Sequence, residues 1–78
     1  MESIYMTATN PNGLPQEKLH ESIRALLPFK TGAIEVEQDL DGEIAFNIDS
    51  EEGAYDEYPD GAEFGPDEHG VVVQWDTP

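Results

Sequence analysis

The stretch AIEVEQDLDGEIAFNID, residues 33–49, decides the fold. Apolar and polar residues alternate on both sides of Asp41-Gly42. Alternation with a period of two is typical of a β-strand that has one face on a core, and Asp-Gly is a strong hairpin signal. The stretch therefore predicts two antiparallel strands, 33–39 and 43–49. Their inward residues are Ile34, Val36, Ile44, Phe46 and Ile48.

The length of the connecting turn decides which residues lie opposite each other. A two-residue turn would pair Leu40 with Glu43 and put the two apolar sets on opposite faces, because a slip of one residue reverses every side chain. We therefore expect a three-residue loop, 40–42, with Gly42 in the left-handed conformation. The cross-strand pairs would then be Val36–Phe46, Ile34–Ile48, Glu37–Ala45, Glu35–Asn47 and Asp39–Glu43.

The rest of the chain supplies two more strands and a helix. Residues 3–9 alternate and predict a first strand, and residues 71–75 predict the last one. Pro15 is expected as the first helical residue. The spacing of the apolar residues after it predicts a helix, and Pro28 is expected to end it. The expected core consists of Ile4, Met6, Leu19, Ile23, Leu26, Ile34, Val36, Phe46, Ile48, Val71 and Val73.

These elements predict the α+β class, with one helix packed on a small, mostly antiparallel sheet. The expected order is β-α-β-β-(long acidic loop)-β, in a single domain that spans residues 1–78. Residues 50–70 are expected to form the long acidic loop, since they hold eight acids and no Lys or Arg. Loops of this length in small domains are usually functional or disordered.

Composition excludes several classes of function. The 78 residues include 18 Asp and Glu against three Lys and Arg, a net charge of −15. Binding to nucleic acid or to anionic lipid through a basic patch is excluded, because no such patch can form. The absence of cysteine excludes disulfides and thiolate sites and favours a reducing cytosol. No membrane span or signal peptide is visible, so we expect a cytoplasmic protein.

We do not expect an enzyme, a cofactor or a dedicated metal site. His20 and His69 have no partners at a recognised spacing, and the chain is too short to line a cleft. The sequence Glu37-x-Asp39-x-Asp41-Gly42 resembles the start of a calcium loop, but Ile48 stands at its twelfth position, where a bidentate Glu is needed. Weak calcium binding by the long loop remains open. Its candidate ligands are Asp56, Glu57, Asp60 and Glu63.

The distribution of charge points to a partner. The three basic residues lie at positions 18, 24 and 30, and residues 33–78 hold 15 acids and no Lys or Arg. Outward residues two apart on a strand stand about 6.7 Å from each other. A row of Glu35, Glu37 and Asp39 would therefore imitate a row of phosphates, which advance about 3.4 Å along the axis and also wind around it. The expected partner is a host enzyme with a basic groove for DNA.

Two short motifs carry a resemblance to a known family. Glu2-Ser3-Ile4-Tyr5-Met6, followed by Leu14-Pro15-Gln16-Glu17, resembles the phage uracil-DNA glycosylase inhibitors. The resemblance implies an edge strand that enters the DNA groove of the glycosylase, with a carboxylate in place of a phosphate. It also implies a cavity between helix and sheet that captures an apolar side chain of the enzyme. The residues so assigned are Glu2, Ser3 and Ile4 at the groove, Met6 at the cavity and Glu17 as a second acidic contact.

The sequence thus predicts a phage-type acidic protein that mimics DNA and inhibits a host DNA-binding enzyme, first of all uracil-DNA glycosylase. It would work in the host cytoplasm. Other targets with basic grooves remain open, namely a CRISPR effector, a restriction enzyme or a repair nuclease. A small acidic binding domain from a salt-adapted organism is the alternative of a different class.

Overall fold

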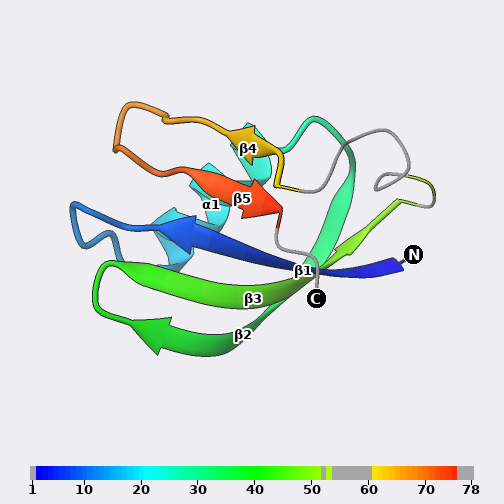
Figure 1. Ribbon diagram of the computed structural model, residues 1–78, viewed down its shortest axis with the longest axis horizontal. Coiled ribbons are helices and arrows are strands. Elements are labelled where there is room, and N and C mark those ends of the chain that lie inside the picture. Colours follow the sequence, from blue (N-terminus) through cyan, green and yellow to red (C-terminus); the bar gives the residue numbers. More distant parts are fainter. Residues whose placement is uncertain (1, 52, 54–60, 76–78) are drawn as a thin grey trace.

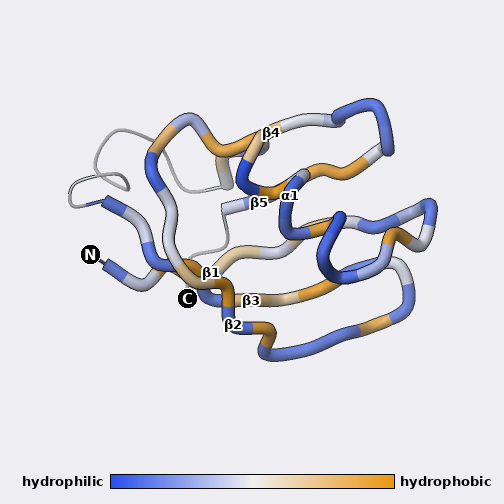
Figure 2. The backbone as a smooth tube through the Cα atoms, turned by 180° about the vertical axis from the view of Figure 1, so that it is seen from behind, coloured by the Kyte–Doolittle hydropathy of each residue, from blue (hydrophilic) through white to orange (hydrophobic). Residues whose placement is uncertain are grey.

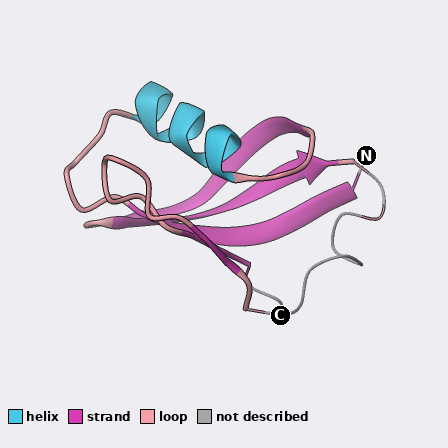
Figure 3. Ribbon diagram, turned by 90° about the horizontal axis from the view of Figure 1, so that it is seen from above, coloured by secondary structure: helices cyan, strands magenta, loops and turns pink. Residues whose placement is uncertain are grey.

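The computed structural model describes residues 2–51, 53 and 61–75, which form one helix and five strands (Figure 1). α1 lies across one face of an antiparallel sheet (Figure 3). The predicted α+β class is confirmed. Residues 50–70 are not one loop, however, because they include the end of β3 and the short strand β4. The elements are β1 (Glu2–Thr9), α1 (Gln16–Leu26), β2 (Thr31–Leu40), β3 (Glu43–Ser50), β4 (Glu63–Phe64) and β5 (Val73–Trp75).

The first strand is the middle strand of the sheet. The strand order is β2-β3-β1-β5-β4. β1 pairs with β3 along its whole length, from Glu2↔Ser50 to Thr9↔Glu43, and with β5 through residues 6–8. The edge position implied by the family resemblance is therefore wrong for this chain. The cause is the apolar face of β1, which is buried beneath α1 with a strand on either side of it.

The core lies between α1 and the sheet. Of the eleven expected core residues, eight are buried, while Leu26, Ile34 and Val36 are partly buried at its margin. Ile34 and Val36 lie on the edge strand β2, which has a neighbour on one side only. Figure 2 shows hydrophobic stretches mainly in the strands and hydrophilic residues in the turns. The core cluster comprises Ile4, Met6, Ala8, Leu19, Ile23, Leu27, Ile44, Phe46, Ile48, Val71, Val73 and Trp75.

The β2–β3 hairpin keeps the expected register only in its first part. The pairs Ile34↔Ile48, Glu35↔Asn47 and Val36↔Phe46 are confirmed. The register then shifts, so that Gln38 pairs with Ala45, Asp39 with Ile44 and Leu40 with Glu43.

A β-bulge therefore replaces the expected three-residue loop. Glu37 is the extra residue, and the turn has the two residues Asp41 and Gly42. Gly42 has a φ of 78°, as expected for the left-handed region. Asp41 does not have a positive φ, so the turn is not one of the mirror-image types usual for two-residue hairpins. The bulge absorbs the slip of one residue that a two-residue turn creates.

The bulge reverses the faces of the residues that follow it. Asp39, opposite the buried Ile44, lies on the helix side of the sheet, where its Oδ2 accepts a hydrogen bond of 3.2 Å from Gln16 Nε2. Leu40 lies on the other side and is 61% exposed. The expected row of Glu35, Glu37 and Asp39 is thus broken, because its third member points away from the other two.

α1 begins one residue later than expected. Pro15 is the N-cap residue with extended backbone, and the helix ends with the Leu27 N–H bonded to the Ile23 carbonyl at 3.1 Å. Asn10 fixes the preceding turn, because its Oδ1 accepts from Leu14 N at 2.8 Å and its Nδ2 donates to Leu14 O at 2.9 Å. Within the described part of the chain, no helix has the length and apolar character needed to cross a membrane.

The connection from β4 to β5 contains a tightly closed turn. Gly65 has a φ of 115°, and a Cβ atom there would lie 2.5 Å from the carbonyl oxygen of Val71. Asp67 Oδ1 accepts backbone hydrogen bonds from His69 at 2.9 Å and from Val71 at 3.0 Å. The turn is therefore defined by one glycine, one carboxylate and the backbone of residue 71.

Candidate protein-interaction surface

The face of the sheet opposite α1 carries a group of carboxylates. In Figure 3, α1 covers one face and no described element covers the other. Because side chains alternate along a strand, the residues that stand between the buried ones in each strand project to this open face. We call it the acidic face. Its carboxylates are Glu35 and Glu37 of β2, Glu43 and Asp49 of β3, and Glu63 of β4.

The carboxylates of the acidic face have no basic neighbours in the sheet. None of the strands in the described residues contains Lys, Arg or His. Glu37 Oε1 accepts a hydrogen bond of 2.7 Å from Asn47 Nδ2, which fixes this side chain across the hairpin. Their charges are therefore compensated only by solvent and salt.

The centre of the acidic face is uncharged. β1 runs through it and presents four hydroxyl-bearing residues, Ser3, Tyr5, Thr7 and Thr9, at every second position. Three of them are partly buried, and Ser3 is exposed. Acids flank both ends of this row, since Ser3 pairs with Asp49 and Thr9 pairs with Glu43. The surface thus has hydroxyl groups at its centre and carboxylates around them.

The basic residues lie outside the strands. Lys18 and Arg24 lie on α1, and Lys30 lies between α1 and β2. Arg24 Nη2 donates to the carbonyl of Gly32 at 3.2 Å, so that its charge is held beside the helix. Among the described residues, the one contact between a carboxylate and a basic side chain joins Glu68 Oε1 and His69 Nε2 at 3.5 Å, and it is an ion pair only when His69 is protonated. Lys18 and Arg24 thus lie in the helix layer, while Lys30 lies at the end of the sheet, where its backbone bonds Glu51.

The residues assigned by the family resemblance lie in different environments. Ile4 and Met6 are part of the core, with Met6 fully buried, so neither of them lines an open cavity. Glu2 is partly buried on the helix side, and its Oε2 has no hydrogen-bond partner. Glu17 is exposed in the first turn of α1. Only Ser3 lies on the acidic face.

The structure brings together Ser3, Glu35 and Glu37 from the predicted set. It adds Glu43, Asp49, Glu63 and Tyr5, which sequence reasoning did not name as contacts. The alternation around Ile44, Phe46 and Ile48 already placed Glu43 and Asp49 outward, so a signal for them was present. Glu63 had no comparable signal, because a two-residue strand is too short to show a period.

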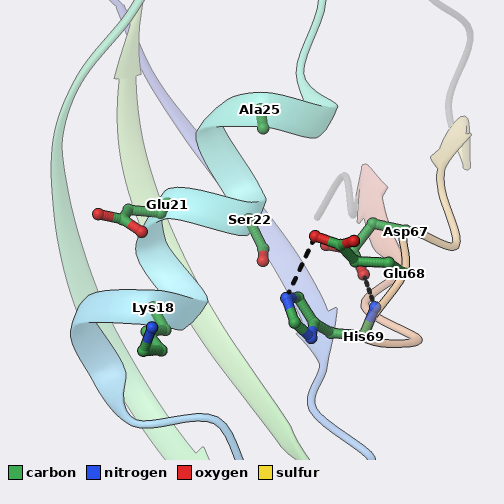
Figure 4. A pocket seen from close by; sticks show the side chains of 7 residues that line it. All are labelled: Lys18, Glu21, Ser22, Ala25, Asp67, Glu68 and His69. Atoms are coloured by element: carbon green, nitrogen blue, oxygen red, sulfur yellow. Dashed lines mark hydrogen bonds and ion pairs between the residues drawn. The ribbon is translucent and has the colours of Figure 1, made fainter.

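A second feature is a hollow of about 500 Å³ between α1 and the turn before β5 (Figure 4). Ser22 of α1 points toward Asp67 and His69 and hydrogen-bonds the Asp67 carboxylate. Burial opposes the ionised form of Asp67, but the bonds from the Val71 and His69 N–H groups and from Ser22 outweigh it and lower its pKa below 3.8. The bond from Ser22 attaches the turn to α1, and the two N–H bonds hold the turn itself.

His20 is the remaining titratable group in an unusual environment. Burial, and secondly the charge of Arg24, lower its pKa below 6.5, so it is neutral at pH 7. Its Nε2 is buried without a hydrogen-bond partner. Both causes act against protonation, so the side chain packs here in its neutral form.

The described residues contain no group of three or more His, Asp or Glu side chains placed to hold a metal ion. Of the four candidate calcium ligands suggested by the sequence, Asp56, Glu57 and Asp60 lie outside the described residues, and Glu63 lies on β4.

No protein-family model matches this sequence, and searches of curated proteins and of solved structures also gave no match.

Proposed function

We propose that this protein is an acidic inhibitor that imitates DNA and occupies the basic groove of a host DNA-binding enzyme with its acidic face. The observation that carries the proposal is a group of carboxylates on a sheet face that carries no cation. Five carboxylates share the open face of the sheet, and the described basic side chains lie on or beside α1. A cationic groove is therefore attracted to this face, where no cation offsets the carboxylates, and the encounter is fast and dependent on salt.

The dimensions of the acidic face suit this role. Glu43 and Asp49 are six residues apart on β3, which corresponds to about 20 Å along a strand. Six phosphate steps along the axis of one DNA strand cover about the same length. Glu35 and Glu37 on the neighbouring strand, about 4.8 Å away, form a second line of charge. The acids thus extend over an area and not along a single row.

Uracil-DNA glycosylase is the specific target that we propose first, because of the two motifs shared with its phage inhibitors. Ser3 and Glu17 are exposed and accessible to a partner. Ile4 and Met6 support the sheet from the core, so any contact made by this strand comes from its open face. A phage origin and a site of action in the host cytoplasm belong to the same proposal.

The experiment measures inhibition of a bacterial uracil-DNA glycosylase at about 20 mM and about 300 mM NaCl, salt levels at which screening differs strongly. We expect equimolar protein to block uracil excision at the lower salt and to lose potency at the higher. Full activity in a large excess of protein at low salt would exclude this target. A panel of restriction and CRISPR nucleases, assayed in the same way, then tests the other basic grooves.

A matched pair of variants tests which surface binds. Glu35→Gln with Glu37→Gln removes two charges from the acidic face, whereas Glu21→Gln with Glu68→Gln removes two from the helix layer. We expect the first pair to weaken inhibition at least about tenfold, since losing one partner of a close interfacial pair costs about 2–5 kcal/mol. The second pair should change it about twofold. Equal losses would mean that charge acts in bulk, and the mimicry would have to be abandoned.

Circular dichroism at low salt distinguishes the proposed DNA mimic from the alternative, a small acidic domain of a salt-adapted organism. A protein that imitates DNA should be folded at about 10 mM salt, where charges are screened least. A domain adapted to high salt should unfold under this condition, because self-repulsion of its carboxylates is then strongest.

A further inference from the structure

The turn before α1 is joined to the turn before β5 by a side chain that can change chemically. Asn12 Nδ2 donates a hydrogen bond of 2.7 Å to the carbonyl oxygen of His69, 57 residues later in the chain. Asn12 is exposed and is followed directly by Gly13. A side-chain amide is lost readily from an Asn-Gly pair, because glycine has no side chain to shield its backbone nitrogen.

This hydrogen bond lies within a close junction of the two turns. Gly13 N donates to the carbonyl of Asn10 at 3.3 Å and closes the turn around Pro11 and Asn12. Gly70 in the opposite turn lies so close to the proline ring that a Cβ atom on it would be 3.0 Å from Pro11 Cγ and 3.8 Å from Asn12 Nδ2. The junction therefore leaves little room for Asn12 to move while it is closed.

Both groups that react in the loss of the amide are engaged in the folded state. The reaction begins when the backbone nitrogen of Gly13 attacks Cγ of Asn12, so the nitrogen must lose its proton and the side chain must turn toward it. The bond to the Asn10 carbonyl holds that proton, and the bond to the His69 carbonyl holds the side chain. The reaction therefore proceeds from a locally opened state, which folded proteins populate at their turns.

We propose that Asn12 is a site of spontaneous deamidation and that the reaction releases the turn of residues 10–13 from the turn of residues 67–70. The Gly13 nitrogen gives its proton to water and forms a bond to Asn12 Cγ. The Cγ–Nδ2 bond breaks, and the amide nitrogen takes up a proton and leaves as ammonia. Water then opens the five-membered imide, which leaves aspartate or isoaspartate at position 12. One water is consumed and one ammonia is released, with no oxidation, no cofactor and no second enzyme.

The product cannot restore the bond between the turns. At neutral pH its carboxylate offers only acceptor oxygens, and the His69 carbonyl is an acceptor as well. The sheet itself stays joined, because Thr9 N donates to Val72 O at 2.9 Å and Thr9 Oγ1 accepts from Val72 N at 2.9 Å. The change is therefore local and runs in one direction. It is independent of the proposed function, since it needs no partner.

The first test follows the mass of proteolytic fragments of the full chain during incubation at neutral pH and physiological temperature. The comparison is the peptide acetyl-Thr-Asn-Pro-Asn-Gly-Leu-amide, which has the sequence of residues 9–14 without the fold. We expect Asn12 to convert in both, at least about tenfold more slowly in the folded chain, a factor that corresponds to about 1.4 kcal/mol. Equal rates, or an unmodified Asn12 in the folded chain after many half-lives of the peptide, would overturn the inference.

The other two asparagines of the chain are internal controls. Asn10 should stay unchanged because Pro11 has no N–H group that could attack it. Asn47 should stay unchanged because it lies within β3 and is followed by the bulky Ile48. Conversion of either at the rate of Asn12 would show a nonspecific loss and contradict the site.

A matched pair of glycine variants tests whether the junction protects Asn12. Gly70→Ala places a Cβ atom against Pro11, whereas Gly61→Ala meets no described atom within 4 Å, and the two glycines have similar φ values of 76° and 80°. We expect conversion of Asn12 to become severalfold faster in the first variant and to change little in the second. If Gly70→Ala does not fold, Pro11→Ala replaces it, because loss of the ring frees the backbone of the turn. An unchanged rate in the folded variant would contradict the protection.

Hydrogen exchange tests the release of the turn. Asn12→Asp copies one product and should speed exchange of the Gly13 and Gly70 amides, whose N–H groups close the two turns, while the circular dichroism spectrum stays that of the parent. Gln38→Glu, at an exposed position of β2, makes the same change in net charge and should leave both amides unaffected. Unchanged exchange in Asn12→Asp, or an equal increase in both variants, would overturn the inference. Loss of the folded spectrum would contradict a local release.

Discussion

Deleting Glu37 should leave the fold intact, whereas deleting Glu35 two positions earlier should weaken it. Without Glu37, the pairs Val36↔Phe46 and Gln38↔Ala45 become consecutive, and every described pair of the hairpin is retained without the bulge. Without Glu35, Ile34 moves opposite Asn47 on the acidic face, and Ala33 takes its place on the core side. The two deletions remove the same residue type and the same charge.

The magnitudes follow from what each deletion removes. The first loses the Glu37–Asn47 hydrogen bond, worth about 0.5–1.5 kcal/mol, and spares the ordering of one backbone residue, which costs about 1–2 kcal/mol. Its free energy of unfolding should therefore stay within about 1 kcal/mol. The second exposes the partly buried Ile34, and full burial of such a side chain is worth about 1.5–3 kcal/mol. We expect a loss of about 1–2 kcal/mol.

Urea unfolding measures the difference. Trp75, the single tryptophan, is 3% exposed, so its fluorescence reports on the core, and far-UV circular dichroism provides a second probe. For a slope of about 1 kcal/mol per molar urea, the midpoint should fall by about 1–2 M for the deletion of Glu35 and by less than about 1 M for that of Glu37. If the deletion of Glu37 is as harmful as that of Glu35, the bulge is not the device that sets the register.

Three further predictions concern stability. Phe46→Ala, at a fully buried position, should cost about 3–5 kcal/mol out of a total of about 4–12 kcal/mol for a domain of this size; an unchanged thermal midpoint would contradict the core. His20→Leu should raise the midpoint, because it removes a buried nitrogen without a partner. Since the folded pKa of His20 is lowered, the unfolded chain takes up a proton first as the pH falls through 6.5, and the gain should be larger at pH 5 than at pH 7.5; a constant gain would argue against it. The pKa of Asp67 is also lowered on folding, so its contribution is present above pH 3.8 and is lost as the pH falls below it. Asp67→Asn should therefore destabilise the protein at pH 7, with a difference from the parent that disappears in acid unfolding curves near pH 2.

The alternation of residues predicted most of the fold. The faces of Ile34, Val36, Phe46 and Ile48 follow from a period of two, and burial confirms them. The bulge could not be predicted in the same way, because a longer loop and an extra strand residue both correct the same slip. The pairing of the strands shows that the extra strand residue, Glu37, corrects the slip here.

The candidate surface was predicted less completely, for a different reason. A sequence shows which residues project outward from each strand but not the order of the strands. The motif at Glu2 implied an edge, whereas three-dimensional packing places β1 at the centre. Asp39 was assigned to the wrong face through the missed bulge, and Glu63 required pairing between β4 and β5, which only the assembled sheet shows.

The turn at Gly65 has a consequence for recognising distant relatives of this chain. Any side chain at this position would collide with the Val71 carbonyl, so the backbone itself forbids replacement. The N–H group of Val71 also donates a hydrogen bond to Asp67, and the Val71 side chain is buried. Gly65, Asp67 and Val71 are therefore the positions that the geometry of this turn constrains. Exposed acids, by contrast, are under no such backbone constraint. Distant relatives should therefore be recognised more readily by this turn than by the net charge of the chain.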